Sequence, residues 1–245
     1  MATVGYREQL PPTLLRELVE CAWVVDGPGG PVQVLPDGCM DLIRMDGRIV
    51  VAGPDTTASI SRRGAEPFMG LRFRPGVLPR LLGVPAVELR DSRVPLADLG
   101  VAVARHGSLV ELATALASDA SSSETAPWSM SLLGHVTRSF AGGAAVAGVA
   151  DQIGWSSRTL QRQCTAVYGY GPATLRRILR FRRARQLIDG GASYAEAAAA
   201  AGYSDQSHLH REVRDLSGNV LSSLRQASSG ANRSTELPSG SATVA

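Results

Sequence analysis

The residues best suited to metal or redox chemistry are a cysteine and two nearby aspartates, Asp37, Cys39 and Asp41. Alternation along a strand would place these three side chains on one face. A zinc site, however, normally requires four closely spaced ligands. No histidine lies near this segment, since the four in the chain are His106, His135, His208 and His210. We therefore expect no metal here, but a turn and a half-buried strand with Cys39 as a small packed residue.

The sequence contains none of the common enzyme motifs. Its three cysteines, Cys21, Cys39 and Cys164, form no Cys-x-x-Cys pair, and there is no phosphate loop, Gly-x-Ser-x-Gly elbow or His-Glu-x-x-His. An odd number of widely spaced cysteines argues against a disulfide framework and fits a reducing cytoplasm. No segment has the pattern of a signal peptide or a membrane span. We expect a cytoplasmic protein that is not an enzyme, needs no cofactor and contacts no membrane.

Basic charge is concentrated in the second half of the chain. Residues 1–125 contain 12 arginines and 15 acidic residues, and residues 126–245 contain 13 arginines and 7 acidic residues, which gives −3 and +6 and together the net +3. A basic half indicates a polyanionic partner, and nucleic acid is the commonest one. All basic residues are arginine, which is typical of codon bias and does not by itself indicate contact geometry.

An internal repeat in this basic half supplies the elements that must position such side chains. Residues 150–156 (ADQIGWS) are echoed by residues 198–204 (AAAAGYS). In each copy a short helix ends at a glycine that can take a positive φ, an aromatic residue fills the turn, and a serine caps the next helix. Leu160 and Leu209 then face inward and their polar neighbours outward. This is the helix-turn-helix pattern, and it occurs twice.

A long helix is predicted between the two copies. Residues 172–188 begin with Pro172, which suits the first position of a helix. An apolar stripe follows, and arginines cover the remaining faces: Arg176, Arg177, Arg180, Arg182, Arg183 and Arg185. We expect two or three of them to touch phosphate and the others to form a solvated face. Such a helix would place two recognition helices about one DNA turn apart, roughly 34 Å, in successive major grooves.

From Trp128 to about Gln226 the sequence resembles the AraC/XylS family of bacterial transcription regulators. The matching motifs are Gly154-Trp155-Ser156-Ser157-x-x-Leu160-x-Arg162, Gly169-Tyr170-Gly171-Pro172 before the arginine-rich helix, residues 202–211 (GYSDQSHLHR), and the closing Gly218 and Leu224-Arg225. The resemblance implies sequence-specific binding of double-stranded DNA and control of transcription, with RNA polymerase as a partner. It leaves a small-molecule effector at the N-terminal domain and a homodimer open.

Position by position, the resemblance also implies which side chains contact DNA. In the first recognition helix they are Arg158, Gln161 and Arg162; in the second they are Ser207, His208 and Arg211, with Gln206 and His210 beside them. Arginine can pair with guanine and glutamine with adenine, each worth about 1–3 kcal/mol of discrimination. The second unit departs from the family pattern at Leu209, Val213 and Leu221. Its serine and histidine are weaker base readers, which favours phosphate contacts there.

The N-terminal half is predicted to be α+β. Short β-prone runs cover residues 32–35, 39–45, 48–52 and 68–73, with Asp46-Gly47 as a hairpin turn, and helices are expected at 11–23, 77–82 and 109–117. Residues 35–43 (LPDGCMDLI) and 70–76 (GLRFRPG) resemble an uncharacterised domain often fused ahead of this DNA-binding module. That resemblance implies effector sensing or oligomerisation.

Together these observations predict four regions. They are an α+β domain (residues 1–118), a linker (119–127), an all-α domain of about seven helices with two helix-turn-helix units (128–227), and a disordered tail (228–245). The alternative to a DNA-binding regulator is an interaction module whose basic helices bind a protein or RNA. A sequence-specific operator would exclude that alternative.

Overall fold

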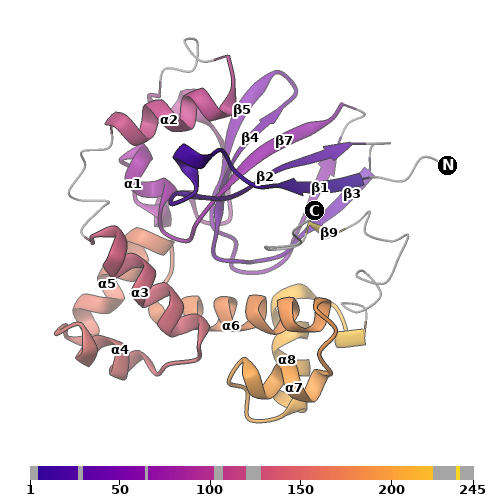
Figure 1. The fold of residues 1–245 in the computed structure, drawn as a ribbon, viewed down its shortest axis with the longest axis vertical. Coiled ribbons are helices and arrows are strands. Elements are labelled where there is room, and N and C mark those ends of the chain that lie inside the picture. Colours follow the sequence, from indigo (N-terminus) through magenta and orange to yellow (C-terminus); the bar gives the residue numbers. More distant parts are fainter. Residues whose placement is uncertain are drawn as a thin grey trace.

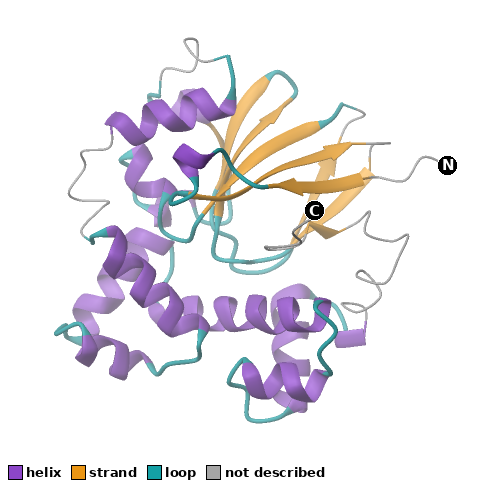
Figure 2. Cartoon of the chain, in the orientation of Figure 1, coloured by secondary structure: helices purple, strands orange, loops and turns teal. Residues whose placement is uncertain are grey.

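The structure, a computed structural model, describes residues 5–26, 30–63, 66–101, 107–119, 128–222 and 236–237. A sheet-rich N-terminal half lies above a helical C-terminal half in Figure 1. The predicted linker lies outside the described residues, apart from the last position of a helix, Asp119. Figure 2 shows the two halves by secondary structure. The predicted fold class, α+β followed by all-α, is confirmed.

Six strands form the main antiparallel sheet, in the order β1-β2-β7-β4-β5-β8. Three correspond to predicted runs: β4 (Met40–Met45), β5 (Arg48–Ala52) and β7 (Phe68–Phe73). The others are β1 (Gly5–Gln9), β2 (Val19–Asp26) and β8 (Arg93–Pro95). Strands β4 and β5 are joined by the predicted hairpin turn, since Asp46 and Gly47 both take positive φ.

The predicted helix over residues 11–23 is wrong. Only Thr13–Leu15 is helical, as the 3-10 helix η1, and from Val19 the chain is strand β2. Buried and half-buried residues alternate strictly along β2, with Val19, Cys21, Trp23 and Val25 on the buried face. That period of two, together with several β-branched residues, outweighs the helical propensity of the preceding leucines.

A second, three-stranded sheet has the order β6-β3-β9. It consists of β3 (Gly30–Val34), β6 (Ser59–Arg63) and β9 (Glu236–Leu237), so a short piece of the predicted tail pairs with β3. The rest of the predicted tail lies outside the described residues. Between the two sheets a small apolar cluster includes Trp23, Val32 and Phe68.

Helices cover the other face of the main sheet. Helices α1 (Leu78–Leu82) and α2 (Leu109–Asp119) confirm two predicted helices and lie beside the sheet in Figure 1. Leu71 of β7 belongs to one buried cluster with Leu78 and Leu112. The short 3-10 helices η2 (Ala86–Leu89) and η3 (Leu96–Leu99) complete this side.

The C-terminal half contains six helices within residues 128–222. They are α3 (Met130–Ala141), α4 (Val146–Gln152), α5 (Ser157–Tyr168), α6 (Pro172–Asp189), α7 (Tyr194–Ala200) and α8 (Gln206–Ser217). Leu221 and Ser222, at the edge of the described range, are also helical. Figure 1 shows α6 running from the group α3–α5 to the pair α7–α8, as predicted for the joining helix.

The arginines of α6 face the protein more than the solvent. Arg176 donates to the carbonyl of Gly143 through Nε and Nη2 (3.1 and 2.9 Å), and Arg180 donates to the carbonyls of Ala201 and Gly202 (3.1 and 2.6 Å). Arg180 and Arg185 are buried. The predicted solvated arginine face is therefore wrong for these two residues, because α6 is packed between both helix-turn-helix units and the N-terminal half.

Both halves share one hydrophobic core. A single cluster of buried side chains runs from Leu15 and Phe73 in the sheet-rich half to Phe181 and Leu216 in the helical half. Gly169, at the end of α5, has a φ of +83°, and a Cβ there would lie 2.6 Å from Pro54 Cγ. Its missing side chain therefore permits close contact between the halves.

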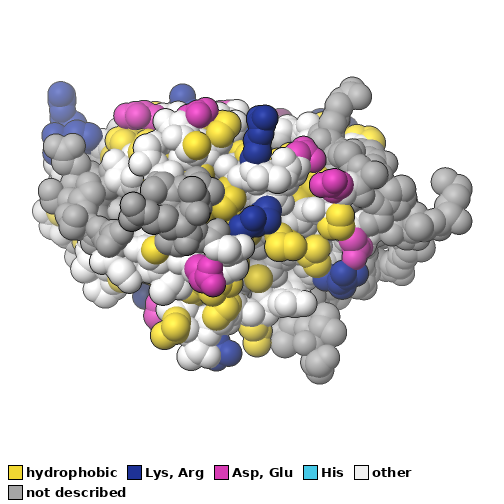
Figure 3. Space-filling model, turned by 90° about the horizontal axis from the view of Figure 1, so that it is seen from above, with side chains coloured by type: hydrophobic (Ala, Val, Ile, Leu, Met, Phe, Trp, Pro, Cys, Tyr) yellow, Lys and Arg dark blue, Asp and Glu magenta, His cyan; other side chains and the backbone are white. Residues whose placement is uncertain are grey.

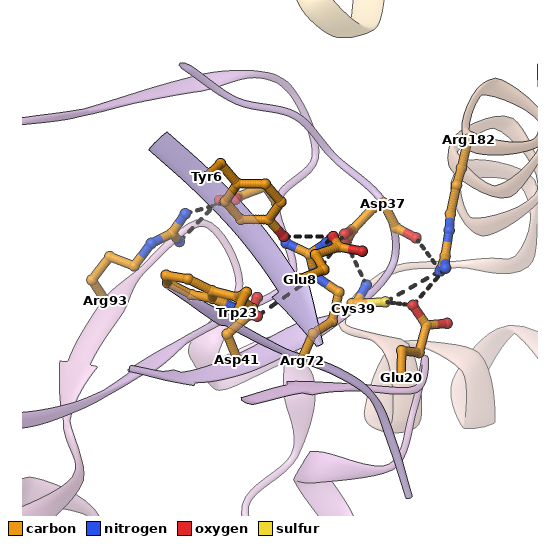
Figure 4. Close-up of polar contacts among 11 residues, drawn as sticks. Tyr6, Glu8, Glu20, Trp23, Asp37, Cys39, Asp41, Arg72, Arg93 and Arg182 are labelled. Carbon is orange, nitrogen blue, oxygen red and sulfur yellow. Dashed lines mark hydrogen bonds and ion pairs between the residues drawn. The ribbon is translucent and has the colours of Figure 1, made fainter. Parts of the chain in front are cut away.

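Polar contacts connect the halves at several places, and three of them reach α5, α6 and α8. Arg182 of α6 pairs with Glu20 of β2 at 2.5 Å, as seen in Figure 4. The second contact lies at the end of α8, where the Gln33 amide donates to the Ser217 carbonyl at 2.8 Å. Arg90 donates to the carbonyl of Gly169 at 3.3 Å. The N-terminal half thus touches α6 and the C-terminal ends of both α5 and α8.

The described part of the chain contains no candidate for a membrane-spanning helix. None of its helices is both long and apolar enough to span a bilayer.

Candidate nucleic-acid interface

Helix α5 is positioned as the second helix of the first helix-turn-helix unit. Helix α4 ends before Gly154, whose φ of +69° turns the chain, and Ser156 caps α5 by accepting from the Thr159 N–H at 3.1 Å. The buried face of α5 carries Leu160 and Cys164. Burial raises the pKa of the Cys164 thiol to about 12, so this cysteine is packed and unreactive.

The three predicted base readers of α5 lie on its exposed face. Arg158, Gln161 and Arg162 are all exposed. Neither arginine makes a hydrogen bond or ion pair with any described residue. The Gln161 amide lies over Gly171, where a Cβ would come within 2.3 Å of its Nε2. The two arginines are therefore unengaged, whereas the glutamine side chain rests against the start of α6.

Helix α8 is capped one residue later than predicted. The repeat predicts Ser204 as the cap, but Asp205 is the capping residue and accepts from the His208 N–H at 2.7 Å. Ser204 instead donates to the Asp205 carboxylate at 3.2 Å. The backbone hydrogen bond from His208 lowers the pKa of Asp205, because it stabilises the ionised cap. Gly202, with a φ of +76°, forms the turn before it.

The predicted contact residues of α8 are less uniform than those of α5. Gln206, Ser207, His210 and Arg211 are exposed, and Arg211 has no hydrogen-bond or ion-pair partner in the described part of the chain. His208 is half-buried. Its Nδ1 lies 3.1 Å from Ser204 Oγ, and its ring packs edge-on against Tyr203.

The two histidine rings of α8 pack against aromatic side chains of the second helix-turn-helix unit. His210 packs edge-on against Tyr194 at the start of α7, with ring centroids 6.4 Å apart. His208 packs on the turn that joins α7 to α8. Both rings therefore contact α7 or the turn after it, although of the two only His208 is partly buried.

The exposed arginines of α5 and α8 contrast with those of α6. On α6, Arg177 makes two hydrogen bonds to the buried carboxylate of Glu212 (3.0 and 3.1 Å), and these raise the pKa of Arg177. Arg180 lies 4.0 Å from the centre of the Tyr203 ring and donates to two carbonyls. Among the described arginines of α5, α6 and α8, those of the two recognition helices are therefore the ones without a partner inside the protein.

Sequence reasoning missed one residue of this surface, Arg214. It is exposed, in the last turn of α8, and has no partner among the described residues. The signal was present in the spacing, because residues 207, 211 and 214 lie on one face of a helix.

The N-terminal half has a surface of mixed character. Figure 3 looks onto the N-terminal half, where the visible basic and acidic side chains are interspersed with apolar ones. No group of His, Cys, Asp and Glu suited to a metal ion occurs in the ranges that the structure describes.

Two family models match the chain. A model described as a helix-turn-helix domain matches residues 149–227, and a model described as a domain of unknown function matches residues 7–95. No curated protein matches the chain.

Solved structures with a similar course of the chain come from two organisms. A probable AraC family transcriptional regulator from Rhodopseudomonas palustris is 23% identical and covers 40% of this chain and 93% of its own, with a TM-score of 0.34. ToxT from Vibrio cholerae is 9% identical over 93% of this chain and 100% of its own, with a TM-score of 0.48. These scores are below 0.5, so the conclusion rests on the family models and the geometry.

Two helix-turn-helix units on one joining helix, with unengaged arginines on each second helix, define a DNA-binding regulator of transcription. More narrowly, a helix-turn-helix domain occupies residues 149–227, and it follows a domain of unknown function over residues 7–95.

Proposed function

We propose that α5 and α8 enter successive major grooves on one side of a DNA duplex and read an operator. Helix α6 has 18 residues and so is roughly 27 Å long at 1.5 Å per residue. With one unit at each end, this length suits recognition helices about one DNA turn apart. A single chain then supplies the two recognition helices that other helix-turn-helix proteins obtain by forming a dimer.

The observation that carries the proposal is the difference between engaged and unengaged arginines. Those of α6 are used within the protein, whereas Arg158, Arg162 and Arg211 are exposed and have no partner in the described chain. Guanidinium groups on the outer face of a recognition helix suit bidentate pairing with guanine and contact with phosphate.

The two units have different roles in this proposal. The first reads bases with Arg158 and Arg162, and Gln161 joins them once its amide leaves Gly171. The second reads through Gln206 and Arg211 and otherwise grips phosphate. Ser207 is short, and His208 and His210 are held by Tyr203 and Tyr194.

The N-terminal half is proposed to regulate this binding. It contacts α6 and the ends of both recognition helices, so a small-molecule effector bound there alters how the two units are held. We propose that the protein acts in the cytoplasm. It controls transcription by contacting RNA polymerase or by obstructing it. A homodimer is compatible with this mechanism.

The test is selection of random DNA duplexes by the purified full chain at physiological salt. We expect a site with two conserved blocks about 10 base pairs apart. Arg162→Ala should weaken binding to that site by at least ~1 kcal/mol and relax preference at one base pair. Arg16→Ala serves as the matched control, since Arg16 is an exposed arginine directly after η1 in the other half.

Three other outcomes would change or overturn the proposal. A single conserved block would mean that only one unit reads bases. An unchanged profile for Arg162→Ala would mean that α5 is not the reading helix. Equal affinity for any duplex or for RNA would overturn the proposal in favour of an interaction module.

A further inference from the structure

A cavity of about 510 Å³ lies between the two sheets of the N-terminal half. Its volume is within the range of small-molecule sites. Apolar walls come from both sheets and include Trp23, Val34, Ile43, Val50 and Phe68. Charged side chains also line it, namely Asp37, Asp41, Asp46, Asp55, Arg48, Arg72 and Arg93. Asp46 and Arg48 contribute opposite charges. The cavity therefore combines apolar walls, which suit the body of a ligand, with charged side chains that can orient it.

The charges in this cavity do not balance. Arg93 and Asp55 form a pair with two short contacts (3.0 and 2.7 Å) and cancel. The single guanidinium of Arg72, however, is shared by Glu8, Asp37 and Asp41 at 3.6, 3.3 and 3.5 Å. Figure 4 shows these carboxylates gathered around it. With all three ionised, this buried cluster carries two negative charges in excess.

One carboxylate oxygen in the cavity is available to a ligand. Asp41 Oδ1 accepts from the Trp23 indole N–H at 2.7 Å and lies near Arg72, whereas Asp41 Oδ2 has no hydrogen-bond partner among the described residues. Excess negative charge away from water is unfavourable, and an opposite charge beside it is the strongest remedy. Aromatic surface next to the carboxylate, from Trp23, also favours a cation.

We propose that this cavity binds a small organic cation, an amine with an apolar body, with its ammonium group at Asp41. The inference rests on the proposed effector control and gives that effector a chemical class. Arg72 and Arg93 would favour an anionic ligand only if they were free, and both are already paired with carboxylates. The apolar body would lie against Trp23 and Phe68.

The cavity also has a short connection to the DNA-binding half. The Asp37 carboxylate, which pairs with Arg72, also accepts from the Cys39 N–H at 2.8 Å. Arg182 of α6 donates to the Asp37 carbonyl at 3.4 Å and to Cys39 Sγ at 3.2 Å. A ligand that binds beside Arg72 and its carboxylates would therefore lie next to the contact between Asp37, Cys39 and Arg182 of α6.

The experiment is calorimetric titration of the full chain, without DNA, at pH 7.5. The probes are primary amines from butylamine to benzylamine, each paired with its neutral alcohol, and benzoate as the anion. We expect at least one amine to bind at least tenfold more tightly than its alcohol, and benzoate not to bind. The inference is overturned if no amine of the series exceeds its alcohol tenfold.

Variants of one residue locate the site. Asp41→Asn should abolish the preference for amine over alcohol, and Asp41→Glu, which keeps the charge, should retain it. Asp98→Asn, an exposed aspartate of η3, is the matched control. A preference that survives Asp41→Asn in folded protein would place the amine elsewhere and overturn the assignment.

Because these titrations contain no DNA, they are independent of the operator selection. A chain that selects an operator but prefers no amine contradicts the inference alone. A chain that prefers amines but selects no operator contradicts the proposed function alone.

Discussion

Asp41 shows how one residue can be costly to the fold and useful to a site. Burial raises the pKa of its carboxyl from 3.8 to about 6; Asp37 acts in the same direction, and Arg72 and the Trp23 indole oppose it. At neutral pH the group is therefore ionised at the expense of stability. Such strain in a cavity is typical of a site that binds a complementary charge.

The pKa of Asp41 predicts a pH-dependent effect of Asp41→Asn. Because the folded state binds this proton more tightly than the unfolded state, the stabilisation from protonation is full below pH 4 and is lost as pH rises through about 6. The variant stays neutral. Its free energy of unfolding should therefore rise relative to the wild type by up to about 3 kcal/mol between pH 4 and pH 7, at about 1.36 kcal/mol per pKa unit.

Urea unfolding of both proteins at these two pH values measures the difference. Asp98→Asn should show no comparable change. An equal difference between wild type and Asp41→Asn at both pH values would contradict the assigned environment of Asp41.

Among the elements, α6 uses its arginines in two ways, and the sequence alone does not show which arginine serves which purpose. Its arginines cap the ends of other elements, as Arg180 does for the carbonyls that follow α7, and pair with buried acids, as Arg177 does with Glu212. This makes the joining helix a rigid centre of the DNA-binding half.

Arg180→Ala should therefore affect folding rather than recognition. The change removes the donors to two carbonyls and a guanidinium packed on Tyr203, which should lower the free energy of unfolding by roughly 2–3 kcal/mol. The control, Arg214→Ala, removes an exposed arginine without a partner in the described chain and should change stability by less than about 0.5 kcal/mol. Equal effects of the two variants on thermal unfolding would contradict this assignment.

Local patterns predicted the helical elements well because each carried its own signal. Gly154 and Gly202 mark both turns, and Pro172 marks the start of α6. The hairpin at Asp46-Gly47 was equally local. The predictions that failed depend on partners far along the chain. Residues 19–26 form strand β2 because they pair with β1 and β7. Arg180 is buried because α7 ends beside it.

The candidate sites were predictable to different degrees for the same reason. Exposure of Arg158 and Arg162 follows from helix periodicity around Leu160. The cavity cluster could not be found in this way, because Glu8, Asp41 and Arg72 meet only after the four strands β1, β2, β7 and β4 have paired. The sequence places Asp37 and Asp41 close together, but it does not show that Arg72 lies beside them.

At the scale of the whole molecule, the two halves are not independent bodies. Their buried side chains form one cluster, and the Arg182–Glu20 pair lies across the boundary. Regulation through the N-terminal half then needs no large movement, because it already touches the helices that face DNA.

A shared core predicts cooperative unfolding of the full chain. We expect one transition in differential scanning calorimetry, with equal calorimetric and van't Hoff enthalpies. Circular dichroism should report the loss of sheet and of helix at the same temperature. Two separated transitions would show that the halves fold as separate units and would weaken the proposed route of regulation.

The inward-facing arginines of α6 have a consequence for how binding responds to salt. Each phosphate neutralised by a protein cation releases condensed counterions, and log K falls with log salt by about 0.9 per phosphate contact. Guanidinium groups held by Gly143, Glu212, Ala201 and Glu20 do not contribute to that release. Operator affinity should therefore survive physiological ionic strength better than the arginine content of this half suggests, and more of its specificity should come from base contacts.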